Sequence, residues 1–247
     1  MTMRIGFWDL ETAPHLANVW GLFDQNISLA QLREASEVIC FGWMWEGDSR
    51  AKVWSVHKHG KEAMLQKAWD LMHEADAVVS WNGQSFDTKT MAKEFLLAGM
   101  PPPSPTKEID LMRAAKKRFR LASNKLDYVS QALGLEGKVK HEGFELWLAC
   151  MQGDDAAWRR MSNYCRKDVE LLVPLFERLK PWIPGIASHA AFRGEDVCPA
   201  CGSEDLRPQG RAFLRAGTYQ RYVCGQCRKW SRGSRRLEST SIVEVSA

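Results

Sequence analysis

Three short acidic segments, two beside apolar runs and one within a helical run, constrain this chain more than any other feature of its sequence. Asp9 and Glu11 close the first β-rich run, and Asp87 follows a later apolar run. Asp168 lies within a long helical pattern. Because Asp9 and Glu11 are two residues apart on a strand, their side chains share one face. The segments therefore predict an α/β fold that brings four carboxylates together.

Strand-like and helix-like patterns alternate over the first 180 residues. The run VICFGWMW at residues 38–45 is almost wholly apolar, which is typical of a central strand. Asn124 and Asp154 are expected to be helix N-caps. Strands are expected over residues 4–10, 38–45, 52–57, 77–81 and 108–111, and helices over residues 61–73, 87–97, 113–119, 126–133, 144–150 and 155–180. This order predicts an α/β protein with a mixed five-stranded sheet flanked by helices.

The spacing of the acidic residues suits divalent metal ions. Tyr164 and Asp168 are four residues apart on a predicted helix, so they lie on one face. Mg²⁺ prefers oxygen ligands, and two such ions about 4 Å apart can carry out phosphodiester hydrolysis. Taken singly, each acid is explained better by a polar strand end, a helix N-terminal charge or a solvated helix position than by a catalytic role. Their occurrence together and in this order favours a nuclease metal site.

The same segments resemble the motifs of a known family, the DEDD superfamily of 3′–5′ exonucleases. The matching motifs are Asp9-x-Glu11, Asn82-x-x-x-Phe86-Asp87 and Tyr164-x-x-x-Asp168. The chain has Asn163 where the His-type branch has histidine, so it resembles the Tyr-type branch. The resemblance covers residues 3–180 and implies a ribonuclease H-like fold.

The resemblance also implies a role for each motif residue. Two Mg²⁺ or Mn²⁺ ions would be held by Asp9, Glu11, Asp87 and Asp168. Tyr164 would complete the catalytic group by orienting, or helping to deprotonate, the attacking water. The substrate would be contacted by Leu10, Thr12, Asn82 and Phe86.

A charged segment between the second and third motifs is a further candidate for substrate contacts. It contains Lys138, Lys140 and His141, and it lies where a nucleic-acid strand could pass. A charged surface loop explains this segment equally well.

Four cysteines near the end of the chain form two matched pairs, Cys198-x-x-Cys201 and Cys224-x-x-Cys227. Four thiolates suit tetrahedral Zn²⁺, and closed sites of this kind are structural. A redox site is the alternative, but redox motifs do not come in matched pairs at this spacing. The segment resembles a zinc ribbon that holds one structural Zn²⁺ between two β-hairpins.

The net charge of +4 is concentrated in this cysteine segment. Residues 1–184 carry 24 basic and 24 acidic side chains, whereas nine basic and no acidic residues lie between Arg207 and Arg236. A basic stretch with interleaved aromatic residues is typical of a nucleic-acid-binding surface. The candidates are Arg211, Arg215, Arg221, Lys229, Trp230, Arg232, Arg235 and Arg236. A solvated tail, with Trp230 in the small core of the ribbon, is the alternative.

These observations predict three parts: a ribonuclease H-like 3′–5′ exonuclease domain at residues 1–184, a zinc ribbon at residues 185–236 and a tail at residues 237–247. The expected activity is metal-dependent hydrolysis of nucleic acid from its 3′ end, with DNA favoured over RNA. The alternatives are a structure-specific endonuclease on the same fold and a non-catalytic nucleic-acid-binding protein that uses the ribbon. A ribbon that recruits a replication protein is a third.

The chain contains no apolar run of the ~18 residues that a membrane span needs, and its N-terminus has no signal-peptide pattern. We therefore expect a cytoplasmic monomer of bacterial or phage type that does not bind membranes. Its expected partners are single-stranded nucleic acid or the 3′ ends of duplexes, with replication or repair proteins as further candidates.

Overall fold

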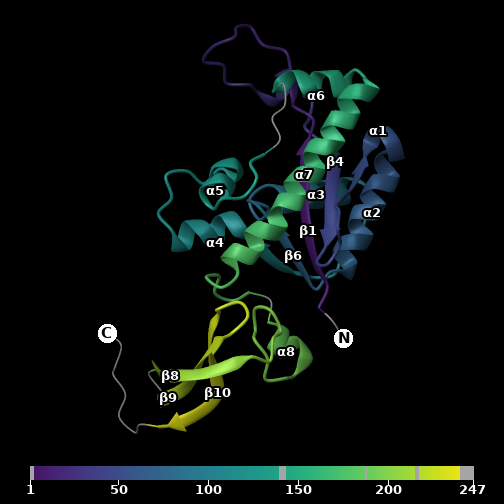
Figure 1. The fold of residues 1–247 in the computed structure, drawn as a ribbon. Helices are drawn as coiled ribbons and strands as arrows, with labels where there is room; N and C mark the ends of the chain where they lie inside the picture. Colours follow the sequence, from purple (N-terminus) through teal and green to yellow (C-terminus); the bar gives the residue numbers. More distant parts are fainter. Residues whose placement is uncertain (1–2, 139–142, 187, 215–216, 240–247) are drawn as a thin grey trace. The chain divides into compact units, whose positions relative to one another are not determined.

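The computed structural model describes residues 3–138, 143–186, 188–214 and 217–239 of the chain (Figure 1). It divides into two compact units. The larger comprises residues 4–176, and the smaller comprises residues 177–247 with the three N-terminal residues. The domain boundaries expected at residues 184 and 236 stay predictions. Within the described ranges, no helix is long and apolar enough to cross a membrane.

A mixed five-stranded sheet lies at the centre of the larger unit. Its strands are β1 (Ile5–Thr12), β4 (Val38–Trp45), β5 (Lys52–Ser55), β6 (Ala77–Ser80) and β7 (Lys107–Asp110). The strand order is β5-β4-β1-β6-β7. The β1–β4 and β4–β5 pairs are antiparallel, and the β1–β6 and β6–β7 pairs are parallel. The predicted fold class is therefore confirmed for this unit.

Seven helices of the described ranges follow or connect these strands. They are α1 (Val56–His59), α2 (Lys61–Glu74), α3 (Asp87–Leu97), α4 (Leu111–Arg118), α5 (Leu126–Ala132), α6 (Phe144–Met151) and α7 (Asp155–Leu179). The longest, α7, crosses β1 and β4 on one side of the sheet (Figure 1).

Helices pack on both faces of the sheet and determine which way the strand residues point. Met91 of α3 packs in one core with Trp8 of β1, and Cys165 of α7 packs in another core with Cys40 of β4. Successive side chains of a strand point to opposite faces. Because Trp8 faces α2 and α3, its neighbour Asp9 faces α7.

The structure differs from the sequence-based expectations at the ends of several elements. β1 continues to Thr12, which pairs with Val38 of β4. A strand was expected through residue 57, but β5 ends at Ser55, whose side chain accepts a hydrogen bond from Lys58 N and starts α1. A side chain that caps a helix in this way favours the helix over continued strand pairing.

The expected helix caps also have different outcomes. Asp154 caps α7 as predicted, because its Oδ1 accepts a hydrogen bond from Ala157 N at 2.8 Å. Asn124 was the wrong residue for α5, whose N-cap is Lys125 and has no side-chain cap bond.

The connection from β1 to β4 forms a small hairpin that no sequence pattern predicted. It comprises β2 (Leu16–Ala17), the 3₁₀ helix η1 (Leu29–Gln31) and β3 (Leu32–Glu34).

The smaller unit contains a short helix and a three-stranded antiparallel sheet. Ser188 caps the helix α8 (His189–Arg193) by accepting a hydrogen bond from Ala191 N. The strand order is β10-β9-β8. The strands are β8 (Leu206–Leu214), β9 (Gly217–Cys224) and β10 (Trp230–Glu238). The four-cysteine cluster joins Cys224, the last residue of β9, to Cys227 in the turn that follows and to Cys198 and Cys201 before β8, so the predicted three-stranded module with a cysteine cluster is confirmed.

Candidate metal centre

Three carboxylates meet between β1 and α7. One oxygen atom each of Asp9, Glu11 and Asp168 lies within 4.8 Å of the other two. Asp9 and Glu11 share the face of β1 that points to α7, and Asp168 comes from α7 itself. Oxygen atoms at these separations can bind a common divalent cation, which takes carboxylate ligands at about 2.0–2.6 Å.

A glycine on β4 allows α7 to approach the sheet closely. A Cβ atom added to Gly42 would lie 2.8 Å from Cγ2 of Val169 and 3.2 Å from Sγ of Cys165. The thiol of Cys165 also lies 3.9 Å from the backbone oxygen of Asp9. The residues on either side of Asp168 are therefore held against the sheet, which places its carboxylate beside Asp9.

Asp87 is a fourth carboxylate, beside this group of three. It is the first residue of α3, is only 3% exposed and accepts a hydrogen bond from Leu10 N at 3.2 Å. Its charge contributes to the raised pKa of Asp9, after burial. The structure therefore brings the acids of all three sequence motifs to one place.

Burial and mutual repulsion raise the pKa values of these carboxyl groups. Burial raises the pKa of Glu11 to about 8, with repulsion from Asp168 as the next cause. Burial also raises the pKa of Asp87 to about 7 and that of Asp9 well above its ordinary value. A bound divalent cation would stabilise the ionised forms, because an opposite charge lowers the pKa of a neighbouring acid. The donor set therefore fits a divalent metal ion.

Lys138 brings a positive charge to the same group. Its Nζ lies 2.5 Å from Oδ2 of Asp168 and donates a hydrogen bond to the hydroxyl of Tyr164 at 2.8 Å. Burial alone would lower the pKa of Lys138, but Asp168 and Tyr164 raise it above its ordinary value. Lys138 is therefore a fixed cation at this site.

Tyr164 lies beside Asp168 and is mostly buried. Burial and the charge of Asp168 raise the pKa of its phenol above the ordinary value. The hydroxyl therefore keeps its proton at neutral pH and can donate it in a hydrogen bond. Its ring also packs edge-on against Trp147, with ring centroids 6.1 Å apart.

The residues expected to contact substrate lie in different surroundings. Leu10 is 4% exposed, so its side chain belongs to the core beside α2 and α3, whereas its backbone N–H contacts Asp87. Phe86 is 46% exposed, next to Asp87. Thr12 is partly exposed at the end of β1, and Asn82 is partly exposed with a positive φ of 70°. Lys140 and His141 lie outside the described residues.

Asp110, which was not among the expected site residues, supports the second motif. This buried residue ends β7, and its Oδ1 accepts hydrogen bonds from the backbone N–H groups of Asn82 and Arg113, both at 3.1 Å. Its Oδ2 is buried and has no hydrogen-bond partner among the described residues. Its charge is one cause of the raised pKa of Asp87, after burial. In the sequence, Asp110 has only the signal of an ordinary N-cap residue.

The four cysteines of the smaller unit form a second candidate site. Their Sγ atoms all lie within 4.8 Å of one another, with 3.6 Å between Cys198 and Cys227 and 3.7 Å between Cys201 and Cys224. Tetrahedral Zn²⁺ with Zn–S bonds of about 2.3 Å would separate the sulfurs by about 3.8 Å. Burial raises the pKa of Cys224, but the N–H groups of Cys227 and Gln226 lower it to about 7. This geometry is consistent with Zn²⁺.

Several basic residues of the smaller unit contact groups within that unit. Arg211 forms an ion pair of 2.6 Å with Glu238, and Nζ of Lys229 donates to the backbone oxygen of Ile183 at 2.5 Å. Ion pairs between exposed side chains are weak, so Arg211 can exchange this partner for a phosphate.

Other basic side chains of this sheet lie over aromatic rings. The guanidinium of Arg221 lies 5.4 Å from the ring centre of Trp230, and that of Arg232 lies 4.5 Å from that of Tyr219. Trp230 is 49% exposed, so it is not enclosed in a core. Arg235 and Arg236 are exposed on β10, and Arg215 lies outside the described residues.

Comparison with known structures supports the fold. Of 128 matching chains, one is the family B DNA polymerase from the hyperthermophilic archaeon Pyrobaculum calidifontis. It is 15% identical, with a TM-score of 0.57, and the match covers 87% of this chain and 32% of the polymerase. The present chain thus matches about a third of the polymerase, and at this identity the likeness is one of fold.

Comparison with known sequences gives a family for the greater part of the chain. No curated protein matches. The sequence model of the RNase H superfamily matches residues 30–180, which include the second and third acidic motifs and most of the sheet. This protein therefore belongs to the RNase H superfamily.

Proposed function

We propose that this protein is a metal-dependent 3′–5′ exonuclease that hydrolyses phosphodiester bonds of nucleic acid. The observation that carries the proposal is the group formed by Asp9, Glu11 and Asp168, whose oxygens lie within 4.8 Å of one another. Asp87 and Tyr164 lie beside it, so the group has the residues of the Tyr-type exonuclease motifs. DNA is favoured over RNA as substrate because a solved structure of similar fold is a DNA polymerase.

The four carboxylates of Asp9, Glu11, Asp87 and Asp168 are the proposed ligands of two Mg²⁺ or Mn²⁺ ions. When bound, such ions supply an activated water molecule and stabilise the charge on the attacking and leaving oxygens. Asp87 and Asp168 are buried and Asp9 and Glu11 are half-buried, so bulk water has limited access to the carboxylates, which strengthens their attraction for cations.

Tyr164 and Lys138 are proposed to act on the substrate and the attacking water. Tyr164 keeps its phenolic proton, so it orients the water through a hydrogen bond and does not act as the base. Lys138 stays charged and can neutralise part of the negative charge on the phosphate. The exposed ring of Phe86, next to Asp87, offers a face on which the terminal base can stack.

The smaller unit is proposed to be a zinc ribbon that binds nucleic acid. Support comes from the separations of the four Sγ atoms and from the exposed Trp230 beside Arg221. Arginine side chains can bind phosphate groups, and an exposed indole can stack on an unpaired base.

A gel assay tests the exonuclease proposal. Single-stranded DNA, duplex DNA and RNA, each labelled at the 5′ end, would be incubated with Mg²⁺ or Mn²⁺ and with EDTA. Wild type would be compared with Asp9→Asn and with Asp70→Asn, a control at an exposed position of α2. The expected result is a metal-dependent ladder that shortens from the 3′ end and is absent only for Asp9→Asn.

Two other outcomes of the same assay would contradict the proposal. Discrete internal cuts would favour the endonuclease alternative. Binding without cleavage of any substrate would favour a non-catalytic nucleic-acid-binding protein.

A further inference from the structure

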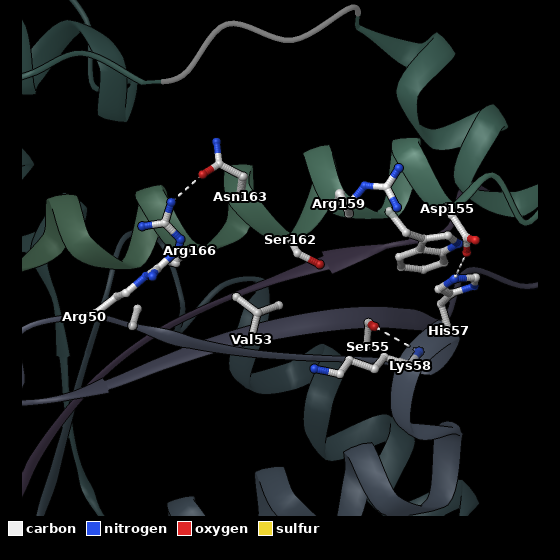
Figure 2. A pocket seen from close by; sticks show the side chains of 12 residues that line it. Arg50, Val53, Ser55, His57, Lys58, Asp155, Arg159, Ser162, Asn163 and Arg166 are labelled. Atoms are coloured by element: carbon white, nitrogen blue, oxygen red, sulfur yellow. Dashed lines mark hydrogen bonds and ion pairs between the residues drawn. The ribbon is translucent and has the colours of Figure 1, made fainter.

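A pocket of about 560 Å³ lies between the edge strand of the sheet and the first half of α7 (Figure 2). One wall comes from the segment that enters β5, from β5 itself and from α1, and the other wall comes from α7. Ser55 and Trp158 are buried at its base. No motif of the sequence pointed to this pocket, because its walls lie about a hundred residues apart in the chain.

The lining of this pocket is strongly basic. It includes Arg50, Lys58, Arg159 and Arg166, whereas Asp155 is its acidic residue. Figure 2 shows Arg50 and Arg166 at one end of the pocket and the Asp155 carboxylate at the other. The cations are therefore distributed along the pocket and do not converge on one point.

Two of the charged lining residues already have partners. Asp155 accepts a hydrogen bond of 2.8 Å from Nε2 of His57, whose ring stacks on Trp158 with centroids 5.1 Å apart. Arg166 forms an ion pair of 2.8 Å with Glu170. The lining thus holds four Arg or Lys side chains and one carboxylate, which gives the pocket a net positive charge.

Arg50, Lys58 and Arg159 form no ion pair of this kind, although the charge of Arg159 also acts on the carboxylate of Asp154, outside the pocket lining. Within the described ranges, no acidic oxygen lies within the 4.0 Å of an ion pair from the side-chain nitrogens of any of them. All three are exposed. An excess of cations along a concave surface attracts polyanions, and the attraction weakens as salt increases.

The pocket is separated from the carboxylates by α7. Ser162 and Arg166 line the pocket, whereas Tyr164 and Asp168 belong to the candidate metal centre. Ser162 is two residues from Tyr164, and Arg166 is two residues from Asp168. Side chains two residues apart on a helix project about 200° from one another. A phosphate in the pocket is therefore not the phosphate that the carboxylates would cleave.

We propose that this pocket binds the phosphate backbone of a nucleic-acid strand at a second site, separate from the bond that is cut. The identity of the polymer rests on the proposed function, whereas the anion site rests on the pocket itself. The distribution of cations along the pocket suits successive phosphates of a strand better than the single terminus of a mononucleotide. The second site would hold the far part of a long substrate, or the complementary strand of a duplex.

Binding measured without hydrolysis tests this proposal independently of the exonuclease proposal. Fluorescence anisotropy of a labelled 30-nucleotide strand would be recorded with the full-length protein and no added Mg²⁺ or Mn²⁺, over a series of salt concentrations. The pocket variant carries Arg50→Ala, Lys58→Ala and Arg159→Ala. The control variant carries Lys117→Ala, Arg118→Ala and Arg120→Ala, which removes the same three charges from exposed positions in and after α4.

We expect the pocket variant to bind the strand about 10-fold more weakly and the control variant to bind within about twofold of wild type. The slope of log affinity against log salt should become less steep by about 2, because each lost phosphate contact of a single strand contributes ~0.7. Cleavage of a saturating short oligonucleotide should be unchanged in both variants. Unchanged binding by the pocket variant, or an equal loss in the control, would overturn the proposal.

Two further experiments test whether the weakening comes from this pocket. If the pocket is the site, Arg159→Glu alone should weaken strand binding, whereas Arg120→Glu should not. Thermal melting would show that both variants are folded. A mononucleotide and an unlabelled strand would be compared as competitors of the labelled strand. If the mononucleotide displaces the labelled strand at the same total phosphate concentration as the unlabelled strand does, the pocket is a nucleotide site and the proposal of strand binding fails.

Discussion

The ammonium group of Lys138 lies 2.5 Å from the carboxylate of Asp168, a proposed metal ligand. The same nitrogen donates a hydrogen bond to the hydroxyl of Tyr164. A cation is thus already present beside Asp168, where it offsets part of the repulsion among the carboxylates. It also occupies an oxygen atom that a metal ion would use.

Replacement of Lys138 by methionine, which keeps most of the volume, should separate these two effects. Without its partner, Asp168 repels Glu11 more strongly, so we expect the metal-free protein to lose ~1–2 kcal/mol of stability. Mn²⁺ should bind more tightly, because it no longer competes with the ammonium group. Calorimetric titration with Mn²⁺ and denaturant unfolding would measure both, with Lys167→Met, on the helix that carries Asp168, as a control. Equal Mn²⁺ affinity in wild type and Lys138→Met would count against the competition.

Substitution of Glu11 by glutamine should stabilise the metal-free protein while it abolishes activity. Burial and Asp168 raise the pKa of Glu11 to about 8, so its ionised form is unfavourable in the folded state. We expect a gain of ~1–2 kcal/mol at pH 8 and a loss of activity of about 10²-fold or more. Denaturant unfolding would measure the stability and the gel assay the activity, and the control Glu62→Gln, at an exposed position of α2, should change neither. A Glu11→Gln protein that is less stable than wild type would show that burial and repulsion do not destabilise the ionised Glu11.

The stability of the metal-free protein should fall as pH rises from about 5 to about 8. The folded-state pKa values of Glu11 and Asp87 are raised to about 8 and about 7, above those of the unfolded chain. The folded state therefore holds more protons in this interval, and linkage makes its stability decrease as these protons are lost. Bound Mg²⁺ should remove much of this loss, because it favours the ionised carboxylates.

Thermal melting at pH 5.5 and pH 8.5, with and without Mg²⁺, would test this linkage. The increase in Tm on addition of Mg²⁺ should be larger at pH 8.5. A Glu11→Gln, Asp87→Asn variant should have a flatter pH profile than wild type in the absence of metal. A wild-type profile that rises with pH in metal-free buffer would show that other groups determine the stability.

Removal of zinc should unfold the smaller unit and leave the larger unit folded. Closed four-cysteine sites contribute the folding free energy of small zinc modules. We therefore expect Cys198→Ser to abolish binding of one Zn²⁺ per chain and to make residues in β8–β10 sensitive to protease. Metal analysis and limited proteolysis would show this, and replacement by Co²⁺ should produce the absorption of a tetrahedral thiolate site; a protease-resistant ribbon in the variant would exclude a structural metal.

Substitution of Asp110 by alanine should destabilise the segment that carries the second motif, although Asp110 is not a proposed metal ligand. The change removes the acceptor of the Asn82 and Arg113 N–H groups, so α4 loses its N-cap. We expect a loss of ~1–2 kcal/mol of stability. Asp110→Asn retains an acceptor oxygen, so it should lose less stability than Asp110→Ala in denaturant unfolding. Equal losses of stability in both variants would show that the charge of Asp110 matters and that its role as a cap does not.

Much of the larger unit could be predicted from sequence because strands and helices have local periods. The apolar run of β4 and the helical pattern of α3 were predicted with their observed bounds. Element ends depended on other contacts. β1 extends to Thr12 because it pairs with β4, and β5 ends early because Ser55 caps α1.

The sequence by itself determined the fold class and the residue types of the candidate metal centre. An Asp-x-Glu on a strand and a Tyr-x-x-x-Asp on a helix each fix, by local geometry, which side chains share a face. The tertiary structure alone decided that Lys138 pairs with Asp168, that Asp110 supports Asn82, and that β5 and α7 enclose a basic pocket. These relationships join residues far apart in the chain, and they depend on how closely a helix packs on a sheet, which no local period encodes.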